Sequence, residues 1–134
     1  MKFIAHGGIK PPVRATQGSA GYDFYSPREI WIMPHEIYEF DTCVSVDIDD
    51  PRIVLKLYVR SSLGRKGITL TNSVGIIDSD YKDHIHAFLI NTSDHAVCIE
   101  QDQRYMQGIF ERYYLTDDDD VKAVRTGGLG STGK

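Results

Sequence analysis

Residues 52–67 read RIVLKLYVRSSLGRKG, and this stretch indicates the kind of fold to expect. Its first half alternates apolar and polar side chains with period two, which is typical of a strand with one buried face. That face would carry Ile53, Leu55, Leu57 and Val59. The second half favours a short helix, with Ser61 or Ser62 as its N-cap and Gly67 near its end. The stretch therefore predicts a strand that leads through an arginine and two serines into a short helix.

Two other segments show the same alternation. CVSVDID, residues 43–49, and HIHAFLI, residues 84–90, each place apolar side chains on one face. Those side chains are Val44, Val46 and Ile48 in the first segment, and Ile85, Ala87 and Leu89 in the second. Clusters of glycine, proline, asparagine and aspartate separate the apolar segments, and the eight tyrosines also favour strands. Short strands at this spacing predict an all-β, jelly-roll-like barrel.

Size and composition indicate one globular unit. The chain has 134 residues, of which 41% are hydrophobic, and a formal net charge of −4. The negative charge argues against a nucleic-acid partner. No apolar run approaches the ~20 residues needed to span a bilayer, and the start MKFIAHGGIKPP lacks a signal-peptide core. Two cysteines without paired or metal-like spacing favour a reducing compartment, so we expect a cytoplasmic protein without a membrane partner.

The chain ends VRTGGLGSTGK, after four consecutive acids at 117–120. Glycines disfavour regular structure, so this end is either frayed or a flexible arm that closes on an anion. Backbone N–H groups with the hydroxyls of Ser131 and Thr132 could bind phosphate oxygens. The acids are more typical of an extended linker than of a cation site. We therefore divide the chain into a barrel domain, 1–116, and a linker and arm, 117–134.

Three stretches contain candidate site residues. In SAGYDFYS, Asp23 is either near a metal or a polar residue on the outer face of a strand. In VRSSLGRKG, Arg60 and a helix N-terminus suit phosphate, although an ordinary helix cap explains the serines equally well. In TNSVGIIDSDYK, Asp78 follows an apolar strand and could take a proton from water, or it could be a turn residue. Asp80 would share a strand face with Asp78.

Five stretches together resemble a known family. SAGYDFYS, VRSSLG, NSVGIIDSDY, QRYMQGIF and GGLGSTG stand in the order of the five motifs of trimeric deoxyuridine triphosphatases (dUTPases), from about residue 19 to the C-terminus. The resemblance implies a jelly-roll-like homotrimer with active sites at subunit boundaries. It also implies that the C-terminal arm of one subunit closes over a neighbouring site, which would make the glycine-rich end a phosphate-capping lid.

The resemblance further implies hydrolysis of dUTP to dUMP and pyrophosphate with Mg²⁺, which keeps uracil out of DNA and supplies dUMP for dTMP synthesis. Asp78 matches the general base that activates a water for attack on the α-phosphorus. Tyr81 matches the aromatic residue under the deoxyribose. Asp23 matches an acid that acts on magnesium through a bound water, and no side chain is implied as a direct metal ligand.

The remaining site residues follow from the same motifs. The phosphate-binding positions are Arg60, Ser61, Ser62, Arg104 and Gln107. The hairpin that receives uracil contains Asn72, Gly75, Ile76 and Ile77. The arm contributes Arg125, Leu129, Gly130, Ser131 and Thr132.

The chain departs from the family pattern at several positions. Leu129 stands where an aromatic residue usually stacks on uracil, so either the lid is weaker or another aromatic, such as Phe88, covers the base. Arg125 comes one place late, Asp83 replaces a common glycine, and motif four reads Asp-Gln-Arg at 102–104 in place of Gly-Asp-Arg. These differences suggest a divergent branch, with a viral origin, and then the host cytoplasm, among the alternatives.

Two rival functions stay open at this point. A dCTP deaminase shares the fold and the Arg-Ser-Ser motif, but it needs a glutamate where Phe88 stands; His84 and His86 are more typical of an exposed strand face. The sequence lacks the H-x-E and P-C-x-x-C pattern of zinc deaminases. The other rival is a binding or regulatory protein on the same scaffold, with a protein partner.

Overall fold

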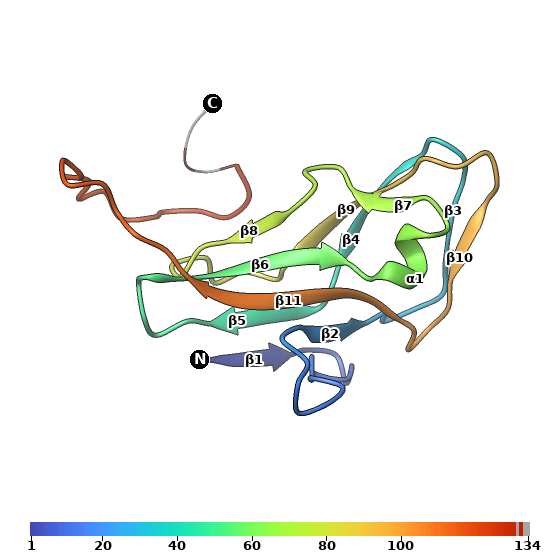
Figure 1. The fold of residues 1–134 in the computed structure, drawn as a ribbon, viewed down its shortest axis with the longest axis horizontal. Coiled ribbons are helices and arrows are strands. Elements are labelled where there is room, and N and C mark those ends of the chain that lie inside the picture. The colour runs from blue at the N-terminus through green and yellow to red at the C-terminus, as the bar shows by residue number, and fades with distance from the viewer. Residues whose placement is uncertain (131, 133–134) are drawn as a thin grey trace.

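The structure is a computed structural model that describes residues 1–130 and 132, and its regular secondary structure is almost entirely β-strand (Figure 1). The single short helix of this described part is α1, Ser61–Gly64. The strands are β1 Lys2–Ala5, β2 Tyr22–Tyr25, β3 Ile30–Ile32, β4 Ile37–Asp41, β5 Val44–Asp47, β6 Ile53–Val59, β7 Ile68–Leu70, β8 Gly75–Ile77, β9 His86–Asn91, β10 Val97–Ile99 and β11 Arg104–Arg112. The prediction of an all-β fold is confirmed.

The strands form four antiparallel groups around one core. A four-stranded sheet has the order β2-β11-β6-β8, a three-stranded sheet has the order β4-β9-β7, and β1-β5 and β10-β3 are pairs. The largest fully buried side chains come from several of these groups and include Tyr105, Phe24, Phe40, Ile32, Leu55 and Leu57. The longest strand, β11, lies between β2 and β6 and so sets the positions of both neighbours.

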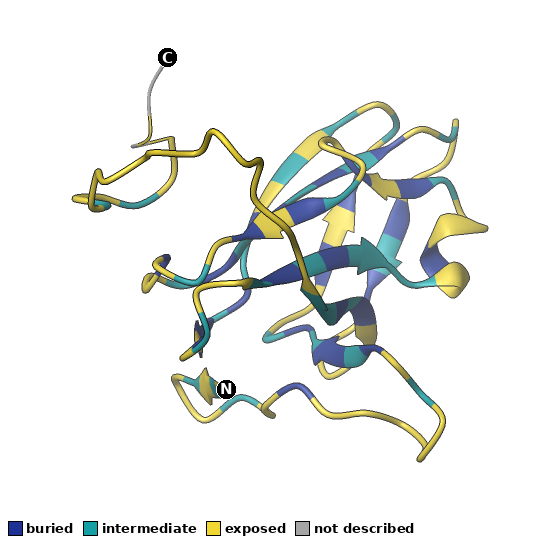
Figure 2. Ribbon diagram, turned by 60° about the vertical axis from the view of Figure 1, so that its left-hand side comes forward, coloured by how far each residue is buried: buried dark blue, intermediate teal, exposed yellow. Residues whose placement is uncertain are grey.

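The three predicted strands are present, with their apolar faces turned inward. In β6, Leu55 and Leu57 are buried, whereas Ile53 and Val59 at the two ends are half-buried. The apolar positions predicted in residues 43–49 and 84–90 are buried as well, although Ile48 and Ile85 lie just outside β5 and β9. Figure 2 shows the contrast between these strands and the mostly exposed C-terminal segment.

The predicted serine cap of the helix is wrong. The N-cap residue of α1 is Arg60, in extended conformation (φ −72°, ψ 148°), and no side chain caps the helix. The chain leaves β6 directly into the helix, and the Arg60 carbonyl accepts the N–H groups of Leu63 and Gly64 at 3.0 Å each. Ser61 and Ser62 are therefore exposed helical residues, and their hydroxyls do not cap this turn.

Gly108, in the middle of β11, has no space for a side chain. A Cβ atom there would lie 2.8 Å from Leu55 Cδ1 and 3.2 Å from Phe24 Cε2. We expect Gly108→Ala to lower the free energy of unfolding by about 1–3 kcal/mol through overpacking, as measured by urea denaturation. Gly18→Ala is the matched control, because nothing lies within 4 Å of its Cβ position. Equal stability of the two variants would contradict this packing.

No helix in the described residues is long and apolar enough to cross a membrane.

Candidate active site

The first group of candidate side chains surrounds Asp23 on β2. The Arg60 Nε atom lies 3.1 Å from Asp23 Oδ1, and the Arg104 Nη1 atom lies 3.3 Å from Asp23 Oδ2. The Asp23 residue is only 4% exposed, whereas both arginine side chains keep part of their surface in solvent. Two guanidinium groups are thus presented to solvent around one buried carboxylate.

Strand pairing explains why these residues meet. β11 pairs with β2 on one side and with β6 on the other, so Gln107 lies opposite both Asp23 and Tyr58. The register shifts between Arg104 and Met106 where β11 pairs with β2. Gln107 also packs closely on Gly21, where any Cβ atom would overlap the Gln107 side chain. We call Asp23, Arg60, Ser61, Ser62, Arg104 and Gln107 the arginine cluster.

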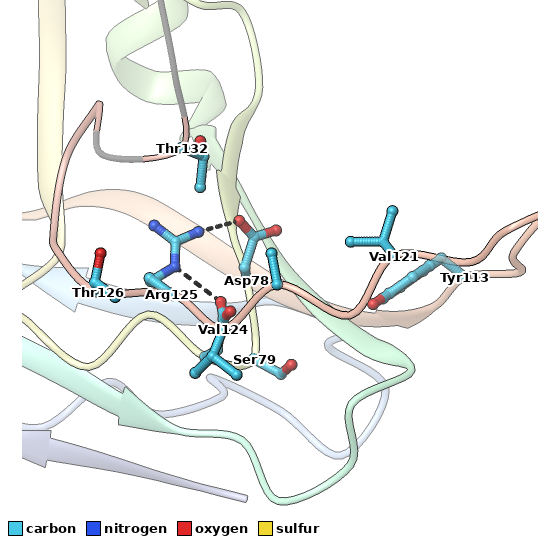
Figure 3. Close-up of a pocket in the computed structure, with 10 residues that line it drawn as sticks. Asp78, Ser79, Tyr113, Val121, Val124, Arg125, Thr126 and Thr132 are labelled. Carbon is cyan, nitrogen blue, oxygen red and sulfur yellow. Dashed lines mark hydrogen bonds and ion pairs between the residues drawn. The ribbon is translucent and has the colours of Figure 1, made fainter.

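The second group lies around Asp78, directly after β8. The Arg125 Nη2 atom is 2.6 Å from Asp78 Oδ2, and Arg125 Nε is 2.9 Å from Asp80 Oδ1. Figure 3 shows the Arg125 guanidinium directed at the Asp78 carboxylate. The bond to Asp80 raises the pKa of the Arg125 guanidinium, although desolvation opposes this shift. The guanidinium carbon also lies 5.7 Å from the centre of the Tyr81 ring, within cation–π range. We call Asp78, Asp80, Tyr81 and Arg125 the carboxylate cluster.

The two carboxylates and the tyrosine differ in accessibility. The Asp78 side chain is about half exposed and faces a pocket of about 510 Å³, which Arg125 and Thr132 also line. Tyr81 is 5% exposed, and burial raises its pKa. Its hydroxyl donates to the His84 carbonyl oxygen at 2.7 Å, so the ring is held in place beside an accessible carboxylate.

The hairpin before Asp78 presents one apolar side chain outward. Gly75 and Ile77 are buried, while Ile76 is 53% exposed. Ile76 and Tyr81 line a small pocket, about 170 Å³, together with arm residues. These arm residues include Arg125, Gly128, Leu129, Gly130 and Thr132. The predicted arm residues of the described chain thus gather at the carboxylate cluster of their own chain; Ser131 lies outside the described residues.

Other predicted residues lie elsewhere. Asn72 is exposed in the turn before β8, and Phe88 is half-buried on β9, opposite Glu39. His84 Nδ1 lies 3.2 Å from Asp41, and His86 Nδ1 lies 3.1 Å from Glu39. Both histidines are therefore partnered and partly exposed, and only His86 lies on a strand, whereas the sequence favoured an exposed strand face for both.

Sequence reasoning missed the role of Asp80 as a partner of Arg125. The spacing of Asp78 and Asp80 gave a signal, because two acids on one side of a chain can bind one guanidinium between them. It also missed the proximity of Asp83 to Gly128, where a Cβ atom would overlap the Asp83 carboxylate. Local patterns could not predict these contacts, because they join positions 45 residues apart in the sequence.

The two clusters lie at opposite ends of β6. Ile77 pairs with Leu55 near the start of β6, whereas Arg60 follows the end of that strand. At the usual rise per strand residue, Asp78 and Arg60 are separated by roughly 20 Å. Figure 1 shows the end of β8 with the arm on one side of the molecule and α1 on the other. Within one chain, the two clusters cannot reach the same phosphorus atom.

No cage for a metal ion is present in the part of the chain that the structure describes. No three His, Cys, Asp or Glu side chains gather there in a way that could hold an ion. Both oxygens of Asp23, which the sequence assigned to a magnesium-bound water, face arginines.

Known proteins show the same fold and sequence pattern. The family model for dUTPase matches residues 8–133. The deoxyuridine 5'-triphosphate nucleotidohydrolase of Lactococcus lactis is 39% identical, over 96% of this chain and 91% of its own length. That of Desulfitobacterium hafniense is 33% identical, over 92% and 87%.

Solved structures agree with the sequence relatives. The crystal structure of dUTPase from Streptococcus mutans is 34% identical and matches with a TM-score of 0.78, over 87% of this chain and 99% of that chain. A Staphylococcus bacteriophage 80alpha dUTPase shares the fold with the same TM-score at 18% identity, over 99% of this chain and 94% of that one. The jelly-roll-like, dUTPase-like fold predicted from the sequence is confirmed, and the chain belongs to the dUTPase family.

Proposed function

We propose that this protein is a Mg²⁺-dependent homotrimer that hydrolyses dUTP to dUMP and pyrophosphate, with Asp78 as the general base. Family membership supports the reaction, because relatives that are 33% and 39% identical are named deoxyuridine 5'-triphosphate nucleotidohydrolases. In the cell this reaction would keep uracil out of DNA and supply dUMP for dTMP synthesis. Both cysteines are free thiols, which suits the reducing cytoplasm.

The separation of the two clusters is the observation that carries the proposal. Asp78 and the arginine cluster must act on the same α-phosphorus, yet within one chain they lie at opposite ends of β6. A second copy of the chain resolves this, because it can place its arginine cluster beside the Asp78 of the first. A closed ring of three chains repeats this interface three times and gives three complete sites.

Each cluster then has a defined chemical task. The exposed Asp78 carboxylate takes a proton from the water that attacks the α-phosphorus. Arg60, Arg104 and Gln107 of the neighbouring chain bind the phosphate oxygens and stabilise the charge that develops on them. Positioning and electrostatic stabilisation are the main contributions that a protein makes to phosphoryl transfer.

Recognition of the base and sugar falls to the hairpin and to Tyr81. Main-chain groups near Gly75 to Ile77 bind the uracil edge, and a cytosine there would leave donors and acceptors unpaired. The Tyr81 ring is held by its hydroxyl bond to His84, so it packs firmly under the deoxyribose and leaves no space for a 2′-hydroxyl. Leu129 lines the same small pocket as Ile76 and covers the base in place of an aromatic side chain.

We expect magnesium to enter this site bound to the triphosphate. Mg²⁺ keeps several waters and is commonly bound through substrate phosphates with few protein ligands. When bound, the ion neutralises triphosphate charge, while the residues of the two clusters position the nucleotide and the water.

A nucleotide panel tests the proposed function. We expect pyrophosphate release from dUTP with Mg²⁺, and at least a hundredfold lower kcat/KM for dCTP, dTTP and UTP, because the hairpin and Tyr81 exclude them. The measurement is coupled detection of pyrophosphate from dUTP and from the eight common ribo- and deoxyribonucleoside triphosphates, with and without Mg²⁺. Ammonia release from dCTP would instead identify a deaminase and overturn the proposal.

A further inference from the structure

The Asp23 carboxylate is a bridge between two arginines. One oxygen faces Arg60 at 3.1 Å and the other faces Arg104 at 3.3 Å. These arginines come from different parts of the fold: Arg60 follows the end of β6, and Arg104 is the first residue of β11. Asp23 is the buried member of the group, at 4% exposure. Both of its oxygens therefore lie against protein cations.

Backbone contacts fix the position of Asp23, whereas the guanidinium groups of Arg60 and Arg104 sit at the ends of long side chains. The Asp23 N–H donates to the Val13 carbonyl at 2.8 Å, and the neighbouring Phe24 is buried in the core. Arg60 is anchored through its own N–H, which donates to the Tyr105 carbonyl at 3.1 Å. The long side chains of Arg60 and Arg104 would otherwise be free to take many rotamers, and their like charges would separate them.

We propose that Asp23 is a positioning residue that holds the Arg60 and Arg104 guanidiniums together in the orientation that binds phosphate. One carboxylate between two guanidiniums leaves a net positive pair, so the cluster attracts an anion while its geometry stays fixed. Each guanidinium has five N–H donors, and binding to Asp23 leaves donors available for phosphate oxygens. This inference rests on the proposed function only for the statement that the anion is a triphosphate.

Binding of inorganic pyrophosphate without metal tests the inference. Asp23→Asn removes a negative charge, so charge alone would strengthen anion binding. If Asp23 positions the arginines, the same variant weakens binding, roughly tenfold or more by the usual strength of charge-assisted hydrogen bonds. Isothermal titration calorimetry of the full chain in EDTA measures whether the substitution weakens or strengthens pyrophosphate binding. Unchanged or tighter binding by Asp23→Asn overturns the inference, as does a wild type without measurable pyrophosphate binding.

A double-mutant cycle separates positioning from general damage to the fold. Arg104→Gln alone should weaken pyrophosphate binding, and adding Asp23→Asn should then have a smaller effect than it has in the wild type. Fully additive effects would show that Asp23 does not act through Arg104. Thermal melting of each variant checks the fold.

A crystal structure of the wild-type protein with pyrophosphate gives a test that needs no variant. We expect both guanidiniums to contact phosphate oxygens while remaining bonded to Asp23. A carboxylate turned away from both arginines would overturn the inference. Because these measurements use neither dUTP nor turnover, their outcome is independent of the proposed reaction: weakened pyrophosphate binding without dUTP hydrolysis would retain the inference and reject the function.

Discussion

Replacing Asp78 with asparagine is expected to lower kcat for dUTP hydrolysis by about 10²–10⁴-fold, the usual contribution of a general base. The amide has nearly the shape of the carboxylate but cannot accept the proton of the attacking water. The Asp78 side chain is about half exposed and directly follows β8, so the substitution should leave the fold intact. Steady-state pyrophosphate release measures the loss.

Substrate binding should survive this substitution. Arg125 keeps its second partner, Asp80, at 2.9 Å, so the arm retains an anchor on the same loop. Titration with a non-hydrolysable dUTP analogue should give a Kd within a few-fold of the wild type. Asp94→Asn is the control for loss of one exposed carboxylate, because Asp94 pairs with His35 on a loop outside both clusters. Normal turnover by Asp78→Asn would show that the assigned base is wrong.

Mixed trimers extend this test to the division of the site between chains. Arg60→Gln should also inactivate the enzyme, because it removes a phosphate-binding guanidinium from the arginine cluster, which lies at the other end of β6 from Asp78. If a site takes Asp78 from one chain and Arg60 from another, co-assembly of the two inactive variants restores some sites with both native residues. Recovered activity after mixing and refolding supports the shared site, whereas a site built within one chain gives no recovery.

The sequence was informative wherever structure follows local periodicity. The alternation in β9 predicted which side chains are buried, because one face of that strand is covered by the core. In β6 it was correct for Leu55 and Leu57, but Val54 on the opposite face is buried too, while Ile53 and Val59 are half-buried. The order of the five motifs predicted the family and the fold. A short helix after Arg60 was also predicted, although it ends at Gly64 and not near Gly67.

Contacts between residues far apart in the sequence were harder to predict from it. The bridge from Asp23 to Arg60 and Arg104 depends on the pairing of β11 with two neighbours and on a register shift near Arg104, which no local pattern specifies. The serine cap was wrong because the end of β6 already fixes Arg60 in an extended conformation. The contacts of Arg125 depend on where a glycine-rich segment folds back, and such a segment has little local preference.

Removal of the C-terminal arm is the second change that we expect to have a large effect on activity. Deleting residues 125–134 is expected to reduce kcat/KM for dUTP by about two orders of magnitude, because lid closure completes such sites and excludes water. Stability should change little, since β11 ends at Arg112 and the two carboxylates paired with Arg125 are about half exposed, so water can replace the arginine. Steady-state kinetics, thermal melting and size-exclusion chromatography with light scattering check activity, fold and assembly together.

Substitution of Arg125 alone separates the arginine from the rest of the lid. Its guanidinium lies 2.6 Å from Asp78 Oδ2, so it occupies one of the two carboxylate oxygens that could accept the proton of the attacking water. An incoming triphosphate competes for the same guanidinium, and drawing it away would leave Asp78 free to act as a base. Arg125→Gln should therefore raise KM more than it lowers kcat, whereas the deletion lowers both kcat and kcat/KM. Asp118→Asn, in the exposed linker, is the matched control and should behave as wild type.

If the truncated protein retains normal turnover, the arm is a frayed end, and the lid has to be sought elsewhere in the chain.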